Sequence, residues 1–316
     1  MNEINDARPS SLSHIIGQRS VVEQVKVAID AAFTDGTPVS SCLLCGPPGV
    51  GKSQLAEVIA QEMAADFHEV LGQSIRSPAD LNALLLEAKD RAVVHIDECH
   101  EMRKDFQTAL YLAIDKRQVF ANIGGRTPQG IPIANFTLLL STTDEYALLQ
   151  PLRDRMKLVL RFEFYSVEEL AELTRLRARG LGWEIDGELL LQIAGRSKGT
   201  PRLALRLLQA CRRVCRSQGE NVIGREHLER ACSLEGIDEL GLGRTEQRYL
   251  EIVADGSTRL NVIASMLGLP TRTVSQVTEP FLIRGGLILK DDQGRRQLTA
   301  MGRELVQRQM KEVASD

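Results

Sequence analysis

The sequence predicts an α/β domain with a parallel sheet, then a helical domain, then a winged-helix domain. In the first half of the chain, short apolar runs alternate with amphipathic stretches, which is typical of parallel strands joined by helices. After residue 165 the apolar runs stop and the spacing of apolar residues becomes helical. Near the C-terminus, three short helical patterns precede a hairpin pattern. We therefore expect domains at residues 1–165, 166–238 and 239–316.

The individual elements follow from the same periodicities. In the first domain we expect buried strands at residues 41–45, 92–96 and 136–140, and helices at 53–63, 77–88 and 105–115. The second domain should hold helices at 166–181, 186–195 and 202–218, the first opened by a capping box of Ser166 and Glu169. A linker is expected at 236–243. The third domain should hold helices at 244–254, 260–267 and 271–284, then a hairpin of residues 286–290 and 295–299.

Composition and charge exclude several classes of protein. Hydrophobic residues make up 43% of the 316 residues and charged residues 26%, which excludes a disordered or fibrous chain. The chain has no apolar run long enough to predict a membrane span, and the six cysteines are expected to be buried thiols of a cytoplasmic protein. The net charge of −3 gives no indication of nucleic-acid binding, but residues 281–312 hold seven basic and four acidic residues. This local excess of positive charge suits contacts with phosphate.

The strongest motif is a phosphate-binding loop. Residues 46–53 read GPPGVGKS and fit G-x-x-x-x-G-K-[ST] between a predicted strand and a predicted helix. Glycines let backbone N–H groups turn toward phosphates, and the helix N-terminus adds a favourable dipole. Lys52 would neutralise phosphate charge, and the Ser53 hydroxyl would ligate Mg²⁺. We expect nucleotide contacts along the loop and the start of the helix, at Gly46, Pro47, Pro48, Gly49, Val50, Gly51, Lys52, Ser53 and Gln54.

Two carboxylates end the second predicted strand. Asp97 and Glu98 follow the run at 92–96, and the carboxyl ends of parallel strands are where such sheets bind ligands. Asp97 can hold Mg²⁺, and Glu98 can polarise a water for in-line hydrolysis. The third predicted strand ends in the hydroxyls of residues 141–143, which could hold that water. His95, inside the apolar run, is expected to be a hydrogen-bonded histidine of the sheet.

Arginines offer further candidate contacts. Arg153 and Arg155 lie in the sequence PLRDR, where an arginine can stabilise transition-state charge in a neighbouring subunit's site or form a surface ion pair. The residues alone leave both interpretations open. Arg202 opens a predicted helix and could contact the nucleotide from the second domain.

These elements in this order resemble the AAA+ ATPases, and seven segments resemble the RuvB family of bacterial Holliday-junction branch-migration motors. The segments are residues 8–18, 46–53, 151–155, 162–173, 198–208, 238–242 and 279–288, and the resemblance covers residues 8–302. It implies an AAA+ core with a helical lid and a winged helix, ATP and Mg²⁺ as ligands, and ATP hydrolysis. It also implies a homo-oligomeric ring, expected to be a hexamer, that acts with RuvA on duplex DNA at Holliday junctions in recombination and repair.

The resemblance also implies roles for individual residues. Asp97 and Glu98 match the Mg²⁺ and catalytic positions, and Thr142 and Thr143 match the region called sensor 1. The arginine finger acting in trans is implied to be Arg155. Further nucleotide contacts are implied at Arg8, Tyr165 and Arg202. Contacts with DNA are implied in the wing, at Lys290, Arg295 and Arg296.

Residues 118–133, with turn residues Gly124, Gly125 and Gly130, resemble the family's protruding β-hairpin, whose tip docks on RuvA. Ile131 and Ile133 match its apolar, partner-facing pair. The alternative is that both isoleucines cover the sheet.

The chain departs from the family pattern at several positions. Ser53 replaces a threonine, which keeps the hydroxyl. The other departures are His95 and Cys99 in place of Phe and Ile, Asp144 in place of Arg, the run Asp115-Lys116-Arg117, and Asp291 and Asp292 in the wing. Both acids of the predicted site remain, so we expect ATP hydrolysis to be preserved.

Two other functions remain open. An AAA+ paralogue could remodel another protein or a DNA clamp, which the departures would fit. A nucleotide-switched DNA-binding scaffold would turn over little ATP, and Glu98 argues against it because such switches commonly lack that base.

Overall fold

A computed structural model describes residues 8–121, 129–256 and 259–313, with side chains up to residue 309. The chain divides into two compact units, which are described separately. The first runs to Trp183 and includes Gly199–Leu205, and the second holds Glu184–Lys198 and the chain from Arg206 onward.

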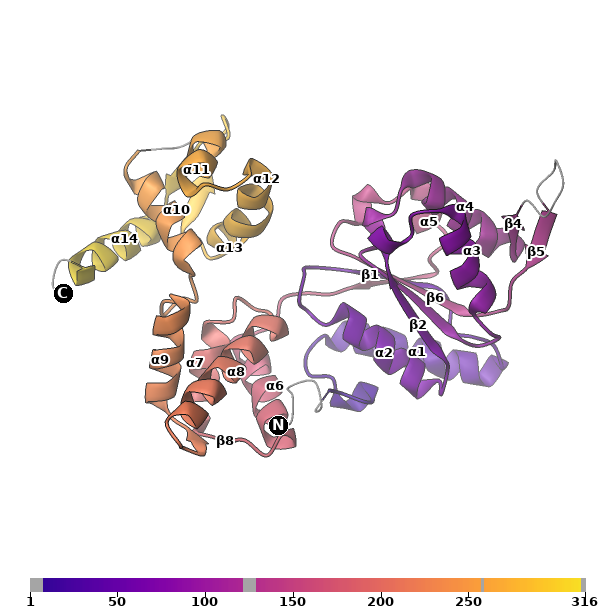
Figure 1. Cartoon of the computed structure of the whole chain (residues 1–316), viewed down its shortest axis with the longest axis horizontal. Helices are drawn as coiled ribbons and strands as arrows, with labels where there is room; N and C mark the ends of the chain where they lie inside the picture. Colours follow the sequence, from indigo (N-terminus) through magenta and orange to yellow (C-terminus); the bar gives the residue numbers. More distant parts are fainter. Residues whose placement is uncertain (1–7, 122–128, 257–258, 314–316) are drawn as a thin grey trace. The chain divides into compact units, whose positions relative to one another are not determined.

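A five-stranded parallel sheet forms the centre of the first unit (Figure 1). Its strands lie in the order β2-β3-β6-β1-β7, and every neighbouring pair is parallel. The bounds are β1 (Cys42–Cys45), β2 (Phe67–Leu71), β3 (Val93–Asp97), β6 (Thr137–Thr142) and β7 (Leu158–Arg161). The three central strands β3, β6 and β1 are those predicted from apolar runs, and their side chains are buried on both faces, as parallel sheets require.

Helices cover both faces of this sheet. Helices α1 (Arg19–Asp35) and α2 (Lys52–Glu62) lie on one face, and α3 (Pro78–Glu87) and α4 (Lys104–Lys116) on the other (Figure 1). The core on the α3–α4 side joins alternate residues of the strands, such as Val94 and Ile96, to Leu85 and Leu110 of the helices. The unit also contains α5 (Gln150–Arg153), a hairpin of β4 (Gln118–Ala121) and β5 (Gln129–Pro132), and α6 (Val167–Gly180).

The sequence analysis missed α1 and the two edge strands. Strand β2 reads FHEVL and is only partly buried, so its polar residues break the apolar run that marks a central strand. Strand β7 has an apolar run of three residues, which is short for a strand signal. Helix α1 did carry a signal, because its buried residues Val21, Val25, Ile29 and Ala32 have helical spacing.

The second unit begins with small elements that the periodicities revealed only in part. It holds α7 (Gly187–Gly195), most of α8 (Pro201–Ser217), α9 (Arg225–Glu235) and the two-residue strands β8 (Glu184–Ile185) and β9 (Val222–Ile223). The predicted linker is an ordered loop. Asp238 accepts hydrogen bonds from the backbone N–H groups of Leu240 and Leu242 at 3.0 and 2.8 Å, and Leu242 is fully buried. A side chain in place of Gly241 would lie 2.2 Å from the Arg196 carbonyl, so the loop packs tightly on the preceding segment.

The winged-helix part contains the predicted helices α10 (Arg244–Ala254) and α11 (Leu260–Leu267) and the hairpin β10 (Ile288–Lys290) and β11 (Arg296–Leu298). The third predicted helix is divided into α12 (Thr271–Thr273), a π-helical turn at Val274–Thr278 and α13 (Glu279–Arg284). Pro280 explains the division, because proline lacks the N–H that would close an ordinary helical turn. The chain continues in α14 (Ala300–Val313), which was not predicted.

A buried carboxylate holds the winged helix together. Glu279 is fully buried and accepts hydrogen bonds from the Tyr249 hydroxyl at 2.9 Å and the Arg296 Nε at 2.8 Å. Lys290 Nζ lies 2.7 Å from its second oxygen. Burial alone would raise the pKa of Glu279, but the hydrogen bonds from Arg296, Lys290 and Tyr249 outweigh it and leave the pKa below its usual value. The cluster therefore ties α10 and α13 to both strands of the wing.

No helix among the described residues is long and apolar enough to cross a membrane.

We expect Glu279→Gln to destabilise the winged helix by about 3 kcal/mol, because it leaves buried cations without their counter-charge. Hydrogen exchange of the α10 and α13 amides in the full chain would measure the loss. Because the folded pKa lies below the usual 4.5, the carboxylate stabilises the fold above that pH, and the difference between variant and parent should shrink as the pH falls below it. The control Glu251→Gln removes a half-exposed pair with Arg248 and should cost less than about 1 kcal/mol. Equal protection in the two variants would contradict a stabilising role for the cluster.

Candidate nucleotide-binding site

The phosphate-binding loop joins β1 to α2, as predicted. Gly49 and Gly51 have φ angles of 78° and 100°, which glycine adopts without strain. At Gly49 space is also limiting, because an added Cβ would lie 3.0 Å from the Arg202 side chain. The backbone N–H of Arg202 donates to the Gly49 carbonyl at 3.3 Å. The predicted residues Gly49 and Arg202, far apart in sequence, are therefore in contact.

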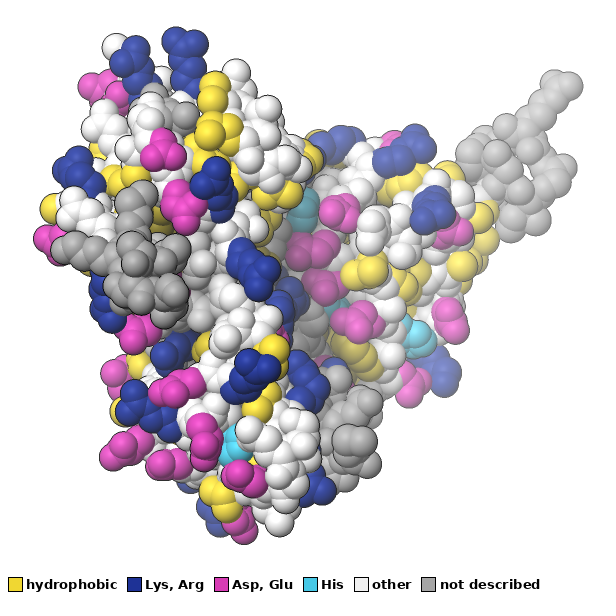
Figure 2. All heavy atoms as spheres, turned by 60° about the vertical axis from the view of Figure 1, so that its left-hand side comes forward, with side chains coloured by type: hydrophobic (Ala, Val, Ile, Leu, Met, Phe, Trp, Pro, Cys, Tyr) yellow, Lys and Arg dark blue, Asp and Glu magenta, His cyan; other side chains and the backbone are white. Residues whose placement is uncertain are grey.

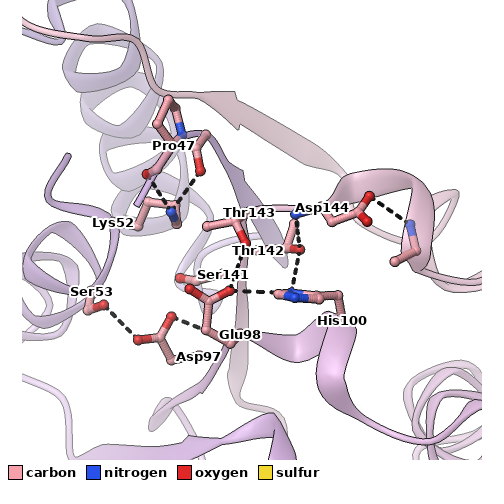
Figure 3. Close-up of polar contacts among 12 residues, drawn as sticks. Pro47, Lys52, Ser53, Asp97, Glu98, His100, Ser141, Thr142, Thr143 and Asp144 are labelled. Carbon is pink, nitrogen blue, oxygen red and sulfur yellow. Dashed lines mark hydrogen bonds and ion pairs between the residues drawn. The ribbon is translucent and has the colours of Figure 1, made fainter. Parts of the chain in front are cut away.

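Lys52 is the buried cation of the loop. Its side-chain ammonium donates to the carbonyl oxygens of Gly46 and Pro47, both at 2.8 Å (Figure 3). Burial lowers the pKa of Lys52, and the carboxylates of Glu98 and Asp97 oppose that effect. Its charge lies where the loop would receive phosphate oxygens.

Ser53 and Asp97 meet at the edge of the sheet. The Ser53 hydroxyl donates to the Asp97 carboxylate at 2.9 Å, and the other carboxylate oxygen accepts the Glu98 N–H at 3.0 Å. A hydroxyl and a carboxylate side by side are hard oxygen donors, and Mg²⁺ takes one or two such protein ligands together with phosphate oxygens and water. The residues present therefore fit a Mg²⁺–nucleotide complex.

Glu98 is held in a conformation that non-glycine residues rarely adopt. Its φ is 46°, and the strain of such a residue is tolerated where the surroundings fix it. The Thr143 hydroxyl donates to its carboxylate at 3.2 Å, and His100 Nδ1 lies 3.3 Å from the same oxygen (Figure 3). The structure thus brings Asp97, Glu98 and Thr143 together as the sequence predicted.

The neighbouring Thr142 makes a second set of contacts. Its hydroxyl lies 3.2 Å from His100 Nδ1 and accepts the Asp144 N–H at 3.0 Å. Asp144 in turn caps the short helix Glu145–Ala147, where its carboxylate accepts the Ala147 N–H at 3.1 Å. One departure from the family pattern therefore has a local structural role. His100 was missed by the sequence analysis, although its position two residues after Glu98 was a signal.

A cleft of about 1350 Å³ joins these groups to the N-terminal segment. Arg8, Gln54 and Tyr165 line it, as predicted for nucleotide contacts, together with Pro48 and Arg202. Arg8 lies 3.6 Å from Glu57, and burial raises the pKa of Tyr165 to about 12, so Tyr165 is an uncharged hydrogen-bonding group at ordinary pH. Apolar residues line the cleft as well, including Ile15, Leu173 and Leu205. Gln18 and Glu69, which the sequence analysis did not select, also line the cleft.

Arg155 lies away from this cleft. Its guanidinium donates to the Asp115 carboxylate with Nε at 2.6 Å and to the Pro151 carbonyl with Nη1 at 2.7 Å. It also stacks 4.8 Å above the Tyr111 ring. The acid at position 115 therefore holds the Arg155 guanidinium against its own chain.

The hairpin disagrees with one prediction. Ile133 is buried in the core of the first unit, and Ile131 packs partly buried against the same core. The burial of Ile133 contradicts a partner-facing role for that residue and fits the alternative of residues that cover the sheet, whereas the partner-facing role of Ile131 stays a prediction. Phe120 of β4 is 43% exposed instead. The tip, including Gly124 and Gly125, lies outside the described residues.

The three predicted DNA contacts in the wing differ in their exposure to solvent. Arg295 and Lys290 are exposed, the Lys290 side chain at 38%, whereas Arg296 is buried. All three guanidinium nitrogens of Arg296 are used inside the domain, two on Glu279 and one on the Gly294 carbonyl. Because its side chain is used inside the domain, Arg296 is not placed to contact DNA. Asp291 closes the wing turn by accepting the N–H groups of Gln293 and Arg295.

Basic and acidic side chains alternate on the surface of the winged-helix part, at the upper left of Figure 2.

All three predicted parts of the chain match domain models of one family. Residues 7–162 match the Holliday junction DNA helicase RuvB P-loop domain, residues 165–238 the RuvB AAA lid domain, and residues 239–307 the RuvB C-terminal winged helix domain. The Holliday junction branch migration complex subunit RuvB of Fervidobacterium nodosum is 37% identical over 91% of this chain and 85% of its own length. The corresponding protein of Koribacter versatilis is 36% identical over 91% and 82%. The solved RuvB Holliday junction branch migration motor of Thermotoga maritima superposes with a TM-score of 0.84 at 32% identity, over 95% of this chain and 98% of that chain.

We expect His100→Ala to lower the kcat of ATP hydrolysis roughly ten-fold, because His100 holds both Glu98 and Thr142 in place. The KM for ATP should change little, because His100 is not among the residues that line the cleft. Steady-state ATPase assays of the purified variant would measure both constants. Glu101→Ala, in the same turn but exposed, is the matched control and should turn over ATP like the parent. An unchanged kcat in His100→Ala would show that Glu98 does not need this contact.

Proposed function

Because the chain belongs to the RuvB family, we propose that it is an ATP-driven motor that moves duplex DNA in the branch migration of Holliday junctions. The observation that carries the proposal is the meeting of Ser53, Asp97, Glu98 and Thr143 at one edge of the sheet, beside the phosphate-binding loop. The matches over all three parts of the chain, and the names of the curated relatives, support the DNA substrate. They also support domain limits near residues 165 and 238.

In this proposal, the residues of the cleft divide the work of hydrolysis. Lys52 and the loop amides would hold the phosphates, and Ser53 and Asp97 would hold Mg²⁺, which when bound neutralises phosphate charge. Glu98 would orient the attacking water and accept its proton, with Thr143 and His100 fixing the carboxylate. Arg202, packed on Gly49, would respond to the phosphates of the nucleotide.

We also propose that a ring of six subunits completes the site. Arg155 is not among the residues that line the cleft of its own chain, which is consistent with a finger that serves a neighbouring subunit. The Arg155 side chain would then have to leave Asp115 before it could enter the nucleotide site of the neighbouring subunit. A ring would place the wings around duplex DNA, with Lys290 and Arg295 on the phosphates.

A RuvA-like protein would dock on the hairpin, where Phe120 offers an exposed apolar side chain. The cytoplasm is the proposed compartment, since all six cysteines are buried free thiols.

We expect Glu98→Gln to bind ATP but turn it over at least 100-fold more slowly, because glutamine keeps the shape of the side chain and removes the base. Nucleotide retained after gel filtration and steady-state ATPase rates would show the two effects. Lys52→Ala, the comparison variant, should lose binding as well as turnover. A Glu98→Gln protein that matches the parent in turnover and in assembly would rule out the motor.

We expect the double variant Lys290→Ala/Arg295→Ala to weaken duplex DNA binding and to reduce the slope of log K against log salt by about 2, because two phosphate contacts are lost. Fluorescence anisotropy with a duplex at several salt concentrations measures both quantities. Arg295→Ala alone should give about half of the change in slope, and it leaves the Glu279 cluster intact. Arg248→Ala, an exposed arginine of α10, is the control. DNA binding equal to the parent's, together with no stimulation of the ATPase by DNA, would contradict the proposed DNA motor.

A further inference from the structure

Three polar side chains form a bridge across adjacent strands of the sheet in the first unit. Glu69 of β2, His95 of β3 and Ser141 of β6 come from adjacent strands. His95 and Ser141 are fully buried, whereas the Glu69 side chain is 47% exposed. Buried polar groups in a parallel sheet are costly unless they are hydrogen-bonded, so this arrangement needs a reason.

The strand register places the three side chains on one face. His95 is paired with Glu69 on one side and with Leu139 on the other, and Ser141 lies two residues beyond Leu139. His95 Nδ1 is 2.9 Å from the Glu69 carboxylate, and Nε2 is 2.6 Å from the Ser141 hydroxyl. The Phe67 ring stacks on the imidazole with centroids 6.1 Å apart.

Both ring nitrogens of His95 have a hydrogen-bond partner in this bridge. The hydrogen bond from His95 leads the effects that hold the pKa of Glu69 below its usual value, so the carboxylate is an ionised acceptor. Nδ1 therefore donates its proton to Glu69. The Ser141 hydroxyl, which can donate or accept, is the partner of Nε2.

The bridge reaches the candidate site at both ends. Glu69 lines the nucleotide cleft. Ser141 is the first of three successive hydroxyls of the β6 end, and each contacts a different polar side chain. Ser141 contacts His95, Thr142 contacts His100, and Thr143 contacts Glu98. The bridge therefore fixes β6 against β3 directly before the residues that hold the catalytic carboxylate.

Two other interpretations of the bridge are weaker. The order acid, histidine, serine is that of a hydrolytic triad, but Ser141 is fully buried in a central strand, where no substrate can reach its hydroxyl. Simple core filling would be served by apolar side chains, which would avoid the cost of burying the polar groups of His95 and Ser141.

We propose that His95 is a positioning residue for ATP hydrolysis: the Glu69–His95–Ser141 bridge sets the end of β6 so that Thr143 and Glu98 meet, and it links that contact to the wall of the nucleotide cleft. The inference rests on the proposed function of the same site.

The test is His95→Phe in the full-length protein, with kcat and KM for ATP measured beside thermal stability. Phenylalanine keeps the ring but leaves the Ser141 hydroxyl and the Glu69 carboxylate without their partner. We expect kcat to fall roughly ten-fold while KM changes by less than about two-fold. Ser141→Ala should also lower kcat, and the double variant should be no slower than His95→Phe alone, because both changes break the same bridge. Ser141→Thr keeps the hydroxyl and should retain most of the parent's kcat.

Val93→Ala is the matched control, because Val93 is a buried residue two positions before His95 on the same strand and face. It should lower the melting temperature without lowering the kcat of the folded protein. If His95→Phe also lowers only the melting temperature, the bridge is structural and the inference is wrong. Additive losses in the double variant would overturn it as well. A parent protein that binds but does not hydrolyse ATP would instead refute the proposed function, which separates the two failures.

Discussion

The candidate site depends on the parallel pairing of β3 with β6 and of β6 with β1. Parallel strands end at one edge, so the loop after β1, the carboxylates that end β3 and the hydroxyls that end β6 all arrive at the same place. The strands are buried on both faces, and a slip of one residue would exchange the two faces and carry polar groups into the apolar core. The hydrophobic contacts that fix the register therefore also fix the distance between Glu98 and Thr143.

The buried polar groups of Lys52, His95 and Glu279 are held in the same way. Lys52 is held by two loop carbonyls, His95 by a carboxylate and a hydroxyl, and Glu279 by a tyrosine and two cations. Each group loses its hydrogen bonds to water on burial and replaces them with directed hydrogen bonds to protein groups. Directed bonds fix orientation, which apolar packing alone does less strictly. The polar clusters thus position the parts that the proposed function uses, namely the phosphate-binding loop, the end of β6 and the wing.

Prediction from sequence was accurate where a residue type and its neighbours suffice. The loop 46–53 has a fixed chemistry, and the central strands have apolar runs, so both were found with small errors in their ends. The edge strands were missed because half-exposed strands mix polar and apolar residues. Arg296 and Ile133 were assigned to surfaces, yet both are buried, because whether a wing or hairpin residue faces inward depends on which partners pack beneath it. A basic residue in a basic segment gives no sign that it will pair with a buried glutamate in the folded domain.

The sequence by itself therefore determined the fold class, the order of the three parts and the chemistry of the phosphate loop, because these follow from local periodicity and from one continuous motif. Tertiary structure alone decided which distant residues meet. It joined His100 to Thr142, Asp115 to Arg155, and His95 to residues on two other strands. Such contacts come from strand order and helix packing, in which segments tens of residues apart become neighbours, and no pattern within one segment encodes them.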